Sequence, residues 1–134
     1  MRVLVVAEHL RGELRPITLE LVSAANDLGE PPVVAVIAKN PRSLADQIDV
    51  GGVAEIVAVK VDQDEFENDV YREAVEQLIS DRSPEVTLLG STVNSMGYGA
   101  AVAVGLSLGF AGVLFAFTRW FWHFGLRNYS GASA

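Results

Sequence analysis

Six small or polar residues between a predicted strand and a predicted helix form the best candidate binding loop in this sequence. They lie within Gly90–Gly99, which reads GSTVNSMGYG, and are Ser91, Thr92, Asn94, Ser95, Gly97 and Gly99. In an open α/β sheet such a loop lies at the carboxyl end of a strand, where ligands bind, and N–H groups at the start of the next helix favour an anion. The pattern indicates a weak contact with the phosphates of a nucleotide or flavin.

Two features of this loop favour a purely structural turn instead. Gly97 and Gly99 begin like a dinucleotide fingerprint, but Val102 replaces its third glycine. No Lys or Arg occurs between Arg82 and Arg119 to meet a phosphate. Both interpretations, a turn packed closely on the strand and a residual cofactor contact, remain open from the residues alone.

Groups for nucleophilic or acid–base catalysis are sparse. The two histidines are His9, which follows the first predicted strand beside Glu8, and His123 in an aromatic segment. A nucleophile needs a base within reach, and no G-x-S-x-G elbow surrounds Ser91 or Ser95. We expect His9 to be a loop residue without a partner, and we find no independent active site.

An acidic run precedes one predicted helix. Its members are Asp62, Asp64, Glu65, Glu67 and Asp69. Carboxylates stabilise the positive end of a helix, and Asp64 with Glu67 has capping-box spacing. We therefore interpret the run as a helix start rather than as a cation site.

The elements that must position these residues alternate between strand and helix. Apolar runs predict strands and amphipathic stripes predict helices. The predicted strands are Arg2–Ala7, Val33–Ala38, Ala54–Val61 and Val86–Leu89, with an optional fifth at Gly112–Thr118, and the predicted helices are Pro16–Leu28, Arg42–Ile48, Phe66–Arg82 and Ala100–Leu106. This order predicts a single-domain α/β fold with a mostly parallel sheet and helices on both faces, Rossmann-like and of the adenine-nucleotide-hydrolase type. Residues expected to be largely buried in central strands are Val3, Val5, Val36, Val57 and Leu88.

Composition excludes several classes of function. The 134 residues suit one domain, and the absence of cysteine excludes zinc fingers, iron–sulfur clusters and thiol catalysis by this chain. A net charge of −7 with scattered basic residues argues against nucleic acid. The first apolar run is stopped early by Glu8, so we expect no secretory signal and a cytoplasmic protein. The uncharged stretch from Val86 to Thr118 suggests a membrane span, but its glycines and polar residues favour strand–turn–helix–strand, so we predict none.

The first thirty residues resemble the start of the electron transfer flavoprotein alpha subunit. The matching residues are Val3-Leu4-Val5-Val6-Ala7-Glu8-His9, then Gly12, Leu14, Pro16, Thr18-Leu19 and Ala24-Ala25, with further likeness at Gly52-Val53-Ala54-Glu55 and at Pro84–Ser91. The likeness covers about residues 1–110. It implies one half of a heterodimer, formed with a beta subunit, that carries electrons on FAD from dehydrogenases to an acceptor.

The resemblance also implies what this chain lacks. In that family FAD is held mainly by a second, carboxyl-terminal domain of the alpha subunit, so no FAD ligand can be carried over and we expect no cofactor on this chain alone. The candidate loop departs from the family, because Ser95, Met96 and Gly97 stand where a glycine, a basic residue and an acid are usual. Ala100-Ala101 likewise replaces Pro-Arg.

The alternative function is a stand-alone nucleotide-binding module of the stress-protein or adenine-nucleotide type. Its ligand would lie against Glu8, His9 and the loop from Ser91 to Gly99.

The C-terminal segment stops resembling the family. We divide the chain into an alpha-type domain at residues 1–111 and a divergent aromatic tail at residues 112–134. Seven of the nine residues from Leu114 to Trp122 are apolar or aromatic, too many for a solvated tail. Either the tail is a truncated or frame-shifted end, or it packs against another chain, such as a second copy.

Overall fold

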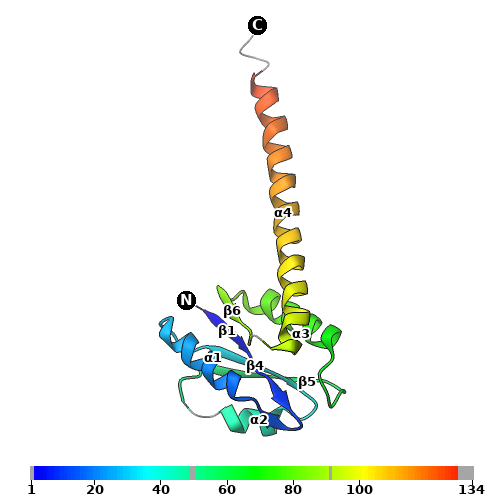
Figure 1. Cartoon of the computed structure of the whole chain (residues 1–134). Coiled ribbons are helices and arrows are strands. Elements are labelled where there is room, and N and C mark those ends of the chain that lie inside the picture. Colours follow the sequence, from blue (N-terminus) through cyan, green and yellow to red (C-terminus); the bar gives the residue numbers. More distant parts are fainter. Residues whose placement is uncertain (1, 49–50, 91, 130–134) are drawn as a thin grey trace. The chain divides into compact units, whose positions relative to one another are not determined.

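The computed structural model describes residues 2–48, 51–90 and 92–129 and has ten elements of secondary structure (Figure 1). In chain order these are β1 (Val3–Val6), β2 (His9–Leu10), β3 (Glu13–Leu14), α1 (Pro16–Asp27), β4 (Val33–Ala38), α2 (Pro41–Ile48), β5 (Glu55–Lys60), α3 (Asn68–Arg82), β6 (Val86–Leu88) and α4 (Val93–Tyr129). The α/β class predicted from the sequence is confirmed.

The chain divides into two compact units, residues 1–100 and 101–134. The first contains both sheets, α1 to α3 and the first turns of α4. In the second, the described residues continue α4 as one uninterrupted helix.

The main sheet has four parallel strands in the order β5-β4-β1-β6. Strand β1 is central because it pairs on one side with β4, through Val5 and Val34, and on the other side with β6, through Val5 and Leu88. Its four residues are all buried, as expected for a valine-rich run covered on both faces.

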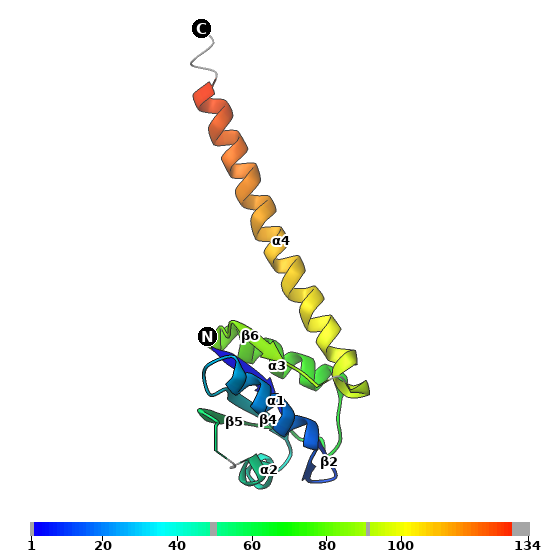
Figure 2. The ribbon, with the colours of Figure 1, turned by 60° about the vertical axis from the view of Figure 1, so that its left-hand side comes forward.

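Successive side chains of the central strands enter two different cores. Val3, Val5 and Ala7 pack with residues of α1 and α2, such as Val22 and Leu44. Leu4 and Ala35 pack on the other face with Leu78 of α3. The two-residue period of a strand thus supplies both layers, and Figures 1 and 2 show α1 and α2 on one face of the sheet and α3 on the other.

The expected burial of the strands holds only for the sheet centre. Val3, Val5 and Val36 are buried, whereas Val57 and Leu88 are half-buried. The prediction was wrong for these two because β5 and β6 are the edge strands of the sheet.

A β-hairpin occupies the stretch that we interpreted as a polar connection. Strands β2 and β3 pair antiparallel across Arg11 and Gly12, which have φ of 51° and 78°. Positive φ at both central residues matches a type I′ turn, which suits a two-residue hairpin. Gln47 of α2 fixes the hairpin, since its Oε1 accepts from the Leu14 N–H at 2.9 Å and its Nε2 donates to the Gly12 carbonyl at 3.2 Å.

Helix α4 overturns two predictions. It starts at Val93, so most of Gly90–Gly99 is helix rather than turn, and it continues through Gly112–Thr118, which is therefore not a fifth strand. Glycine weakens a helix by only about 1 kcal/mol, whereas proline costs about 3 kcal/mol. No proline follows Pro84 in the sequence, and α4 continues through its glycines.

Candidate functional site

Glu8 lies two residues beyond the end of β1, at the edge of the sheet where α/β proteins bind ligands. The backbone of Glu8 is hydrogen-bonded to the side chain of the buried Thr18 in α1. The Glu8 N–H donates to Thr18 Oγ1 at 2.9 Å, and that hydroxyl lies 3.2 Å from the Glu8 carbonyl, to which Arg15 N–H also donates at 2.8 Å. Only 6% of Glu8 is exposed, so its carboxylate points into the protein.

The side chains of Thr92 and Ser95 make hydrogen bonds within the protein at the start of α4. Thr92 Oγ1 donates to Glu8 Oε1 at 2.5 Å. The Thr92 N–H donates to Ser95 Oγ at 3.1 Å, and the Ser95 N–H donates back to Thr92 Oγ1 at 3.3 Å, a reciprocal cap of the helix. The buried Ser95 hydroxyl also donates to the Gly90 carbonyl. Both hydroxyls that we expected at a ligand are therefore already hydrogen-bonded.

The other four predicted site residues are dispersed. Ser91 lies outside the described residues, and Asn94 is half-buried beside Glu8 and His9. A Cβ on Gly97 would lie 2.7 Å from Asn68 Oδ1, and one on Gly99 would lie 2.8 Å from Leu89 Cδ1. These glycines allow α4 to pack closely against Asn68 and Leu89.

His9 has partners, which corrects the expectation of an isolated loop histidine. Its Nε2 lies 2.7 Å from the Ile37 carbonyl and 3.0 Å from Tyr71 Oη. A carbonyl can only accept, so Nε2 must carry a proton at this distance. Tyr71 Oη donates to the same carbonyl at 2.8 Å. This cluster could not be predicted from the sequence, because its three members come from β2, β4 and α3.

Three aromatic rings pack against one another beside Glu8. The centroid of Tyr71 is 4.8 Å from that of Phe66 and 5.5 Å from that of Tyr98, and Phe66 and Tyr98 are 5.9 Å apart. Burial, with a smaller effect of the Glu8 charge, raises the pKa of Tyr71 to about 12. The same causes raise the pKa of Tyr98. Both rings therefore keep neutral hydroxyl groups at physiological pH.

One oxygen of the buried carboxylate remains free. Glu8 Oε2 is buried and has no hydrogen-bond partner among the described residues. Glu8 lines a cavity of about 10 Å³, enough for about one water molecule. The other lining residues are His9, Phe66, Tyr71, Asn94 and Tyr98.

The acidic run does not form the predicted capping box. Helix α3 starts at Asn68, and its N-cap residue, Glu67, makes no side-chain cap hydrogen bond. Asp64 instead pairs with Lys39 at 3.3 Å, and both side chains are largely exposed. Over the described part of the chain, no three His, Asp or Glu side chains are grouped to hold a metal ion.

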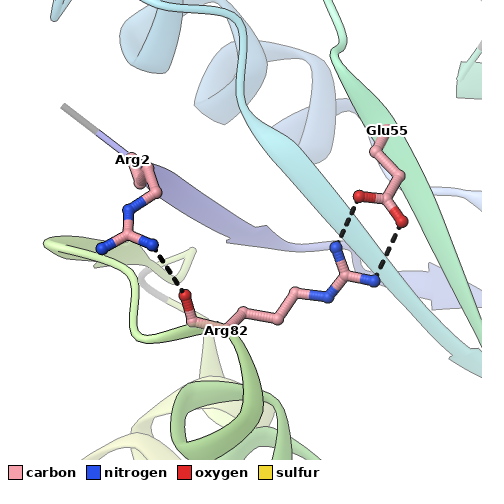
Figure 3. A network of polar contacts seen from close by, with 3 residues as sticks. All are labelled: Arg2, Glu55 and Arg82. Carbon is pink, nitrogen blue, oxygen red and sulfur yellow. Dashed lines mark hydrogen bonds and ion pairs between the residues drawn. The ribbon is translucent and has the colours of Figure 1, made fainter.

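A cavity of about 750 Å³ lies at the opposite, amino-terminal edge of the sheet. Arg82 lines it and makes a bidentate ion pair with Glu55 at 2.5 and 2.9 Å, while Arg2 donates to the Arg82 carbonyl at 3.5 Å (Figure 3). The Arg82 contact lowers the pKa of the Glu55 carboxyl. This edge carries the strand starts, so it lacks the helix N-termini and loop ends that bind ligands in such folds.

A parallel sheet with helices on both faces and a polar cluster after β1 defines a Rossmann-like α/β domain. Residues 3–118 match the electron transfer flavoprotein domain family, and the chain belongs to that family. The match extends beyond residue 110, the limit suggested by the motifs.

Curated relatives agree with the resemblance to the alpha subunit, which is confirmed. The chain is 42% identical to the electron transfer flavoprotein subunit alpha of Methylophilus methylotrophus over 114 residues, which are 82% of this chain and 36% of that protein. It is 34% identical to a probable mitochondrial alpha subunit of Caenorhabditis elegans, over 74% of this chain and 29% of that protein. It is 28% identical to Protein FixB of Clostridium saccharobutylicum, over 78% of this chain and 33% of that protein. The chain thus spans about a third of the length of these relatives.

Proposed function

We propose that this chain serves as the amino-terminal domain of an electron transfer flavoprotein alpha subunit and acts by protein contact rather than by chemistry of its own. Its partner is a beta subunit, and the complete complex carries electrons from dehydrogenases on FAD. The family match over residues 3–118 supports the electron-transfer role. We place its work in the cytoplasm, in keeping with a role between soluble dehydrogenases and their acceptor.

The position of Glu8 is the observation that favours a scaffold over a nucleotide-binding domain. A helix N-terminus at the carboxyl edge of a sheet attracts phosphate because its N–H groups are free and its dipole is positive. Here the Glu8 carboxylate already lies there, bonded to the Thr92 hydroxyl. A phosphate would meet a negative charge in a poorly solvated site, which is strongly unfavourable.

The alternative remains a stand-alone nucleotide-binding module. It is supported by Asn94 and His9, which line a hollow of about 460 Å³ at this edge together with Arg11. Among the described residues that line this hollow, Arg11 is the one arginine or lysine, which makes the hollow a poor phosphate site.

Helix α4 contains one segment, Asn94–Gly125, that is long and apolar enough to cross a membrane, with a hydropathy of 2.2. Length and composition alone are weak support for a span. Core helices of soluble proteins meet the same criteria but are mostly buried, whereas the most apolar part of this segment is 6% buried. The family match includes this segment as far as Thr118. We therefore retain the proposal of a protein without a membrane span.

Two measurements test these proposals. The chain and the beta subunit from the same organism, co-expressed with a tag on the beta subunit only, should co-purify. Calorimetric titration of the chain with AMP, ATP and FAD should give no heat of binding, and its visible spectrum after gel filtration should show no flavin. Micromolar binding of AMP or ATP by a chain that ignores the beta subunit would favour the alternative.

A further inference from the structure

The free oxygen of Glu8 is the feature that the electron-transfer role leaves unexplained. A buried carboxylate oxygen without a hydrogen-bond donor is costly, and native proteins rarely keep one without a function or a bound group. Its companion Oε1 already accepts from Thr92. A donor placed beside Oε2 would satisfy this oxygen, and a positively charged donor would also balance the buried charge.

The size of the cavity limits what that donor can be. About 10 Å³ accommodates one water-sized group, so a guanidinium or a quaternary ammonium is too large. A metal ion would lack ligands, because the described residues offer no group of three His, Asp or Glu side chains. A primary ammonium nitrogen has the size of a water molecule and carries three N–H donors.

The lining of the cavity suits an ammonium group. Glu8 supplies the negative charge, and the Asn94 side chain and the tyrosine hydroxyls offer oxygen acceptors. The rings of Phe66, Tyr71 and Tyr98 add aromatic surface, which attracts cations when the cation lies over a ring face.

A larger hollow lies next to the small cavity. The hollow of about 460 Å³ shares three lining residues with the small cavity, namely His9, Phe66 and Asn94. Asp64 and Glu65 lie on its rim with Arg11, so the rim itself has an excess of one acid. An alkyl chain can lie in this hollow while its terminal nitrogen reaches the cavity.

We propose that Glu8 and the surrounding aromatic side chains form a binding site for a primary ammonium group that enters through this hollow. The group belongs either to a small free alkylamine or to a lysine side chain of another protein. The proposal does not depend on the electron-transfer role, because it rests on the contacts of Glu8 and on the lining of the cavity.

Thermal unfolding with n-butylammonium chloride, which mimics a lysine side chain, tests the proposal. We expect a saturable rise in the unfolding midpoint, because a ligand at 100 times its Kd raises the folded-to-unfolded ratio about 100-fold. Sodium chloride and tetramethylammonium chloride at equal ionic strength should not give this rise. Equal shifts with all three salts would overturn the proposal. An equal effect of ammonium chloride would contradict the proposed place of an alkyl chain in the hollow, and a larger effect of butylammonium would support it.

Variants locate the binding. Glu8→Gln keeps the size of the side chain and the acceptor for Thr92, and should abolish the effect of butylammonium. Glu73→Gln makes the same charge change at an exposed position of α3 and should leave it intact. Should Glu8→Gln fail to fold, Asn94→Leu, which narrows the shared entrance, should lower the butylammonium affinity measured by calorimetry at least tenfold. An unchanged response in either Glu8→Gln or Asn94→Leu contradicts the site.

Discussion

Two threonine hydroxyls connect Glu8 to two helices. Thr18 on α1 bonds its backbone, and Thr92 at the start of α4 bonds its side chain. Each hydroxyl satisfies a group that is removed from water, and such groups cost about 1–3 kcal/mol when left without a partner. These two residues therefore stabilise the carboxyl edge more than their size suggests.

Replacing Thr92 by valine should lower the free energy of unfolding by about 1–3 kcal/mol, because both Glu8 oxygens would then lack a donor and α4 would lose its cap. Urea unfolding measures the change. Thr87→Val in β6 is the matched control and should change stability little, since valine suits a strand. Equal effects of the two substitutions would show that the Thr92 hydroxyl makes no special contribution.

Tyr71 should make stability depend on pH in the alkaline range. Its pKa is raised to about 12 in the fold, against about 10 when unfolded, so the fold favours the neutral form. This contribution is complete below pH 10 and is lost between about pH 10 and 12, by up to about 3 kcal/mol. The stability difference between the wild type and Tyr71→Phe, measured by urea unfolding, should therefore narrow over that range. A constant difference from pH 9 to 12 would contradict the raised pKa.

At the scale of elements, β1 is the strand on which the sheet depends. It pairs on both sides, and its alternate residues enter both cores. The edge strands pair on one side only and are half-buried in part. A change in β1 is therefore expected to affect the whole first unit.

Val5→Asp should prevent folding, because an unpaired buried carboxylate costs several kcal/mol against a total stability of about 5–15 kcal/mol. Circular dichroism and a thermal melt measure the outcome. Val5→Ala, which removes methyl groups without adding charge, should still fold with a lower melting temperature. A soluble Val5→Asp variant with a cooperative melt would disprove the central position of β1.

Strands and helices were predictable where a long apolar run or a helix-start residue lay within the element itself. The valine run of β1 and the proline at the first position of α1 predicted bounds within two residues of those observed. The β2–β3 hairpin was missed because Arg11 rarely adopts a positive φ, and the start of α4 was missed because its glycines resemble a turn. The contacts of Glu8 and His9 could not be predicted, since their partners come from distant segments brought together by packing.

At the scale of the whole molecule, α4 presents many apolar side chains to solvent. Among the described residues of the second unit, Phe110 and Val113 are 68% exposed and Trp122 is 66% exposed. Aromatic residues also stack along the helix, as Trp120 does on Phe124 with centroids 5.8 Å apart. A surface of this kind is usually covered by another chain or by a membrane in the working protein.

Deleting residues 119–134 should lower the number of copies in each particle, as measured by light scattering. The deletion removes aromatic side chains that we propose to lie between copies. The full-length chain is the reference, and Trp120→Ser with Trp122→Ser is a milder version of the same change. A monomer both before and after deletion would rule out the proposed self-association.

The pairing of β1 with β6 also has a consequence for the growing chain on the ribosome. Val3 is synthesised near the start, but its partner Val86 emerges only after most of the first unit has been made. At about 5–20 residues per second this delay lasts several seconds, during which one edge of an apolar strand has no neighbour. Nascent chains stalled before β6 should therefore recruit chaperones, and those stalled just beyond it should release them.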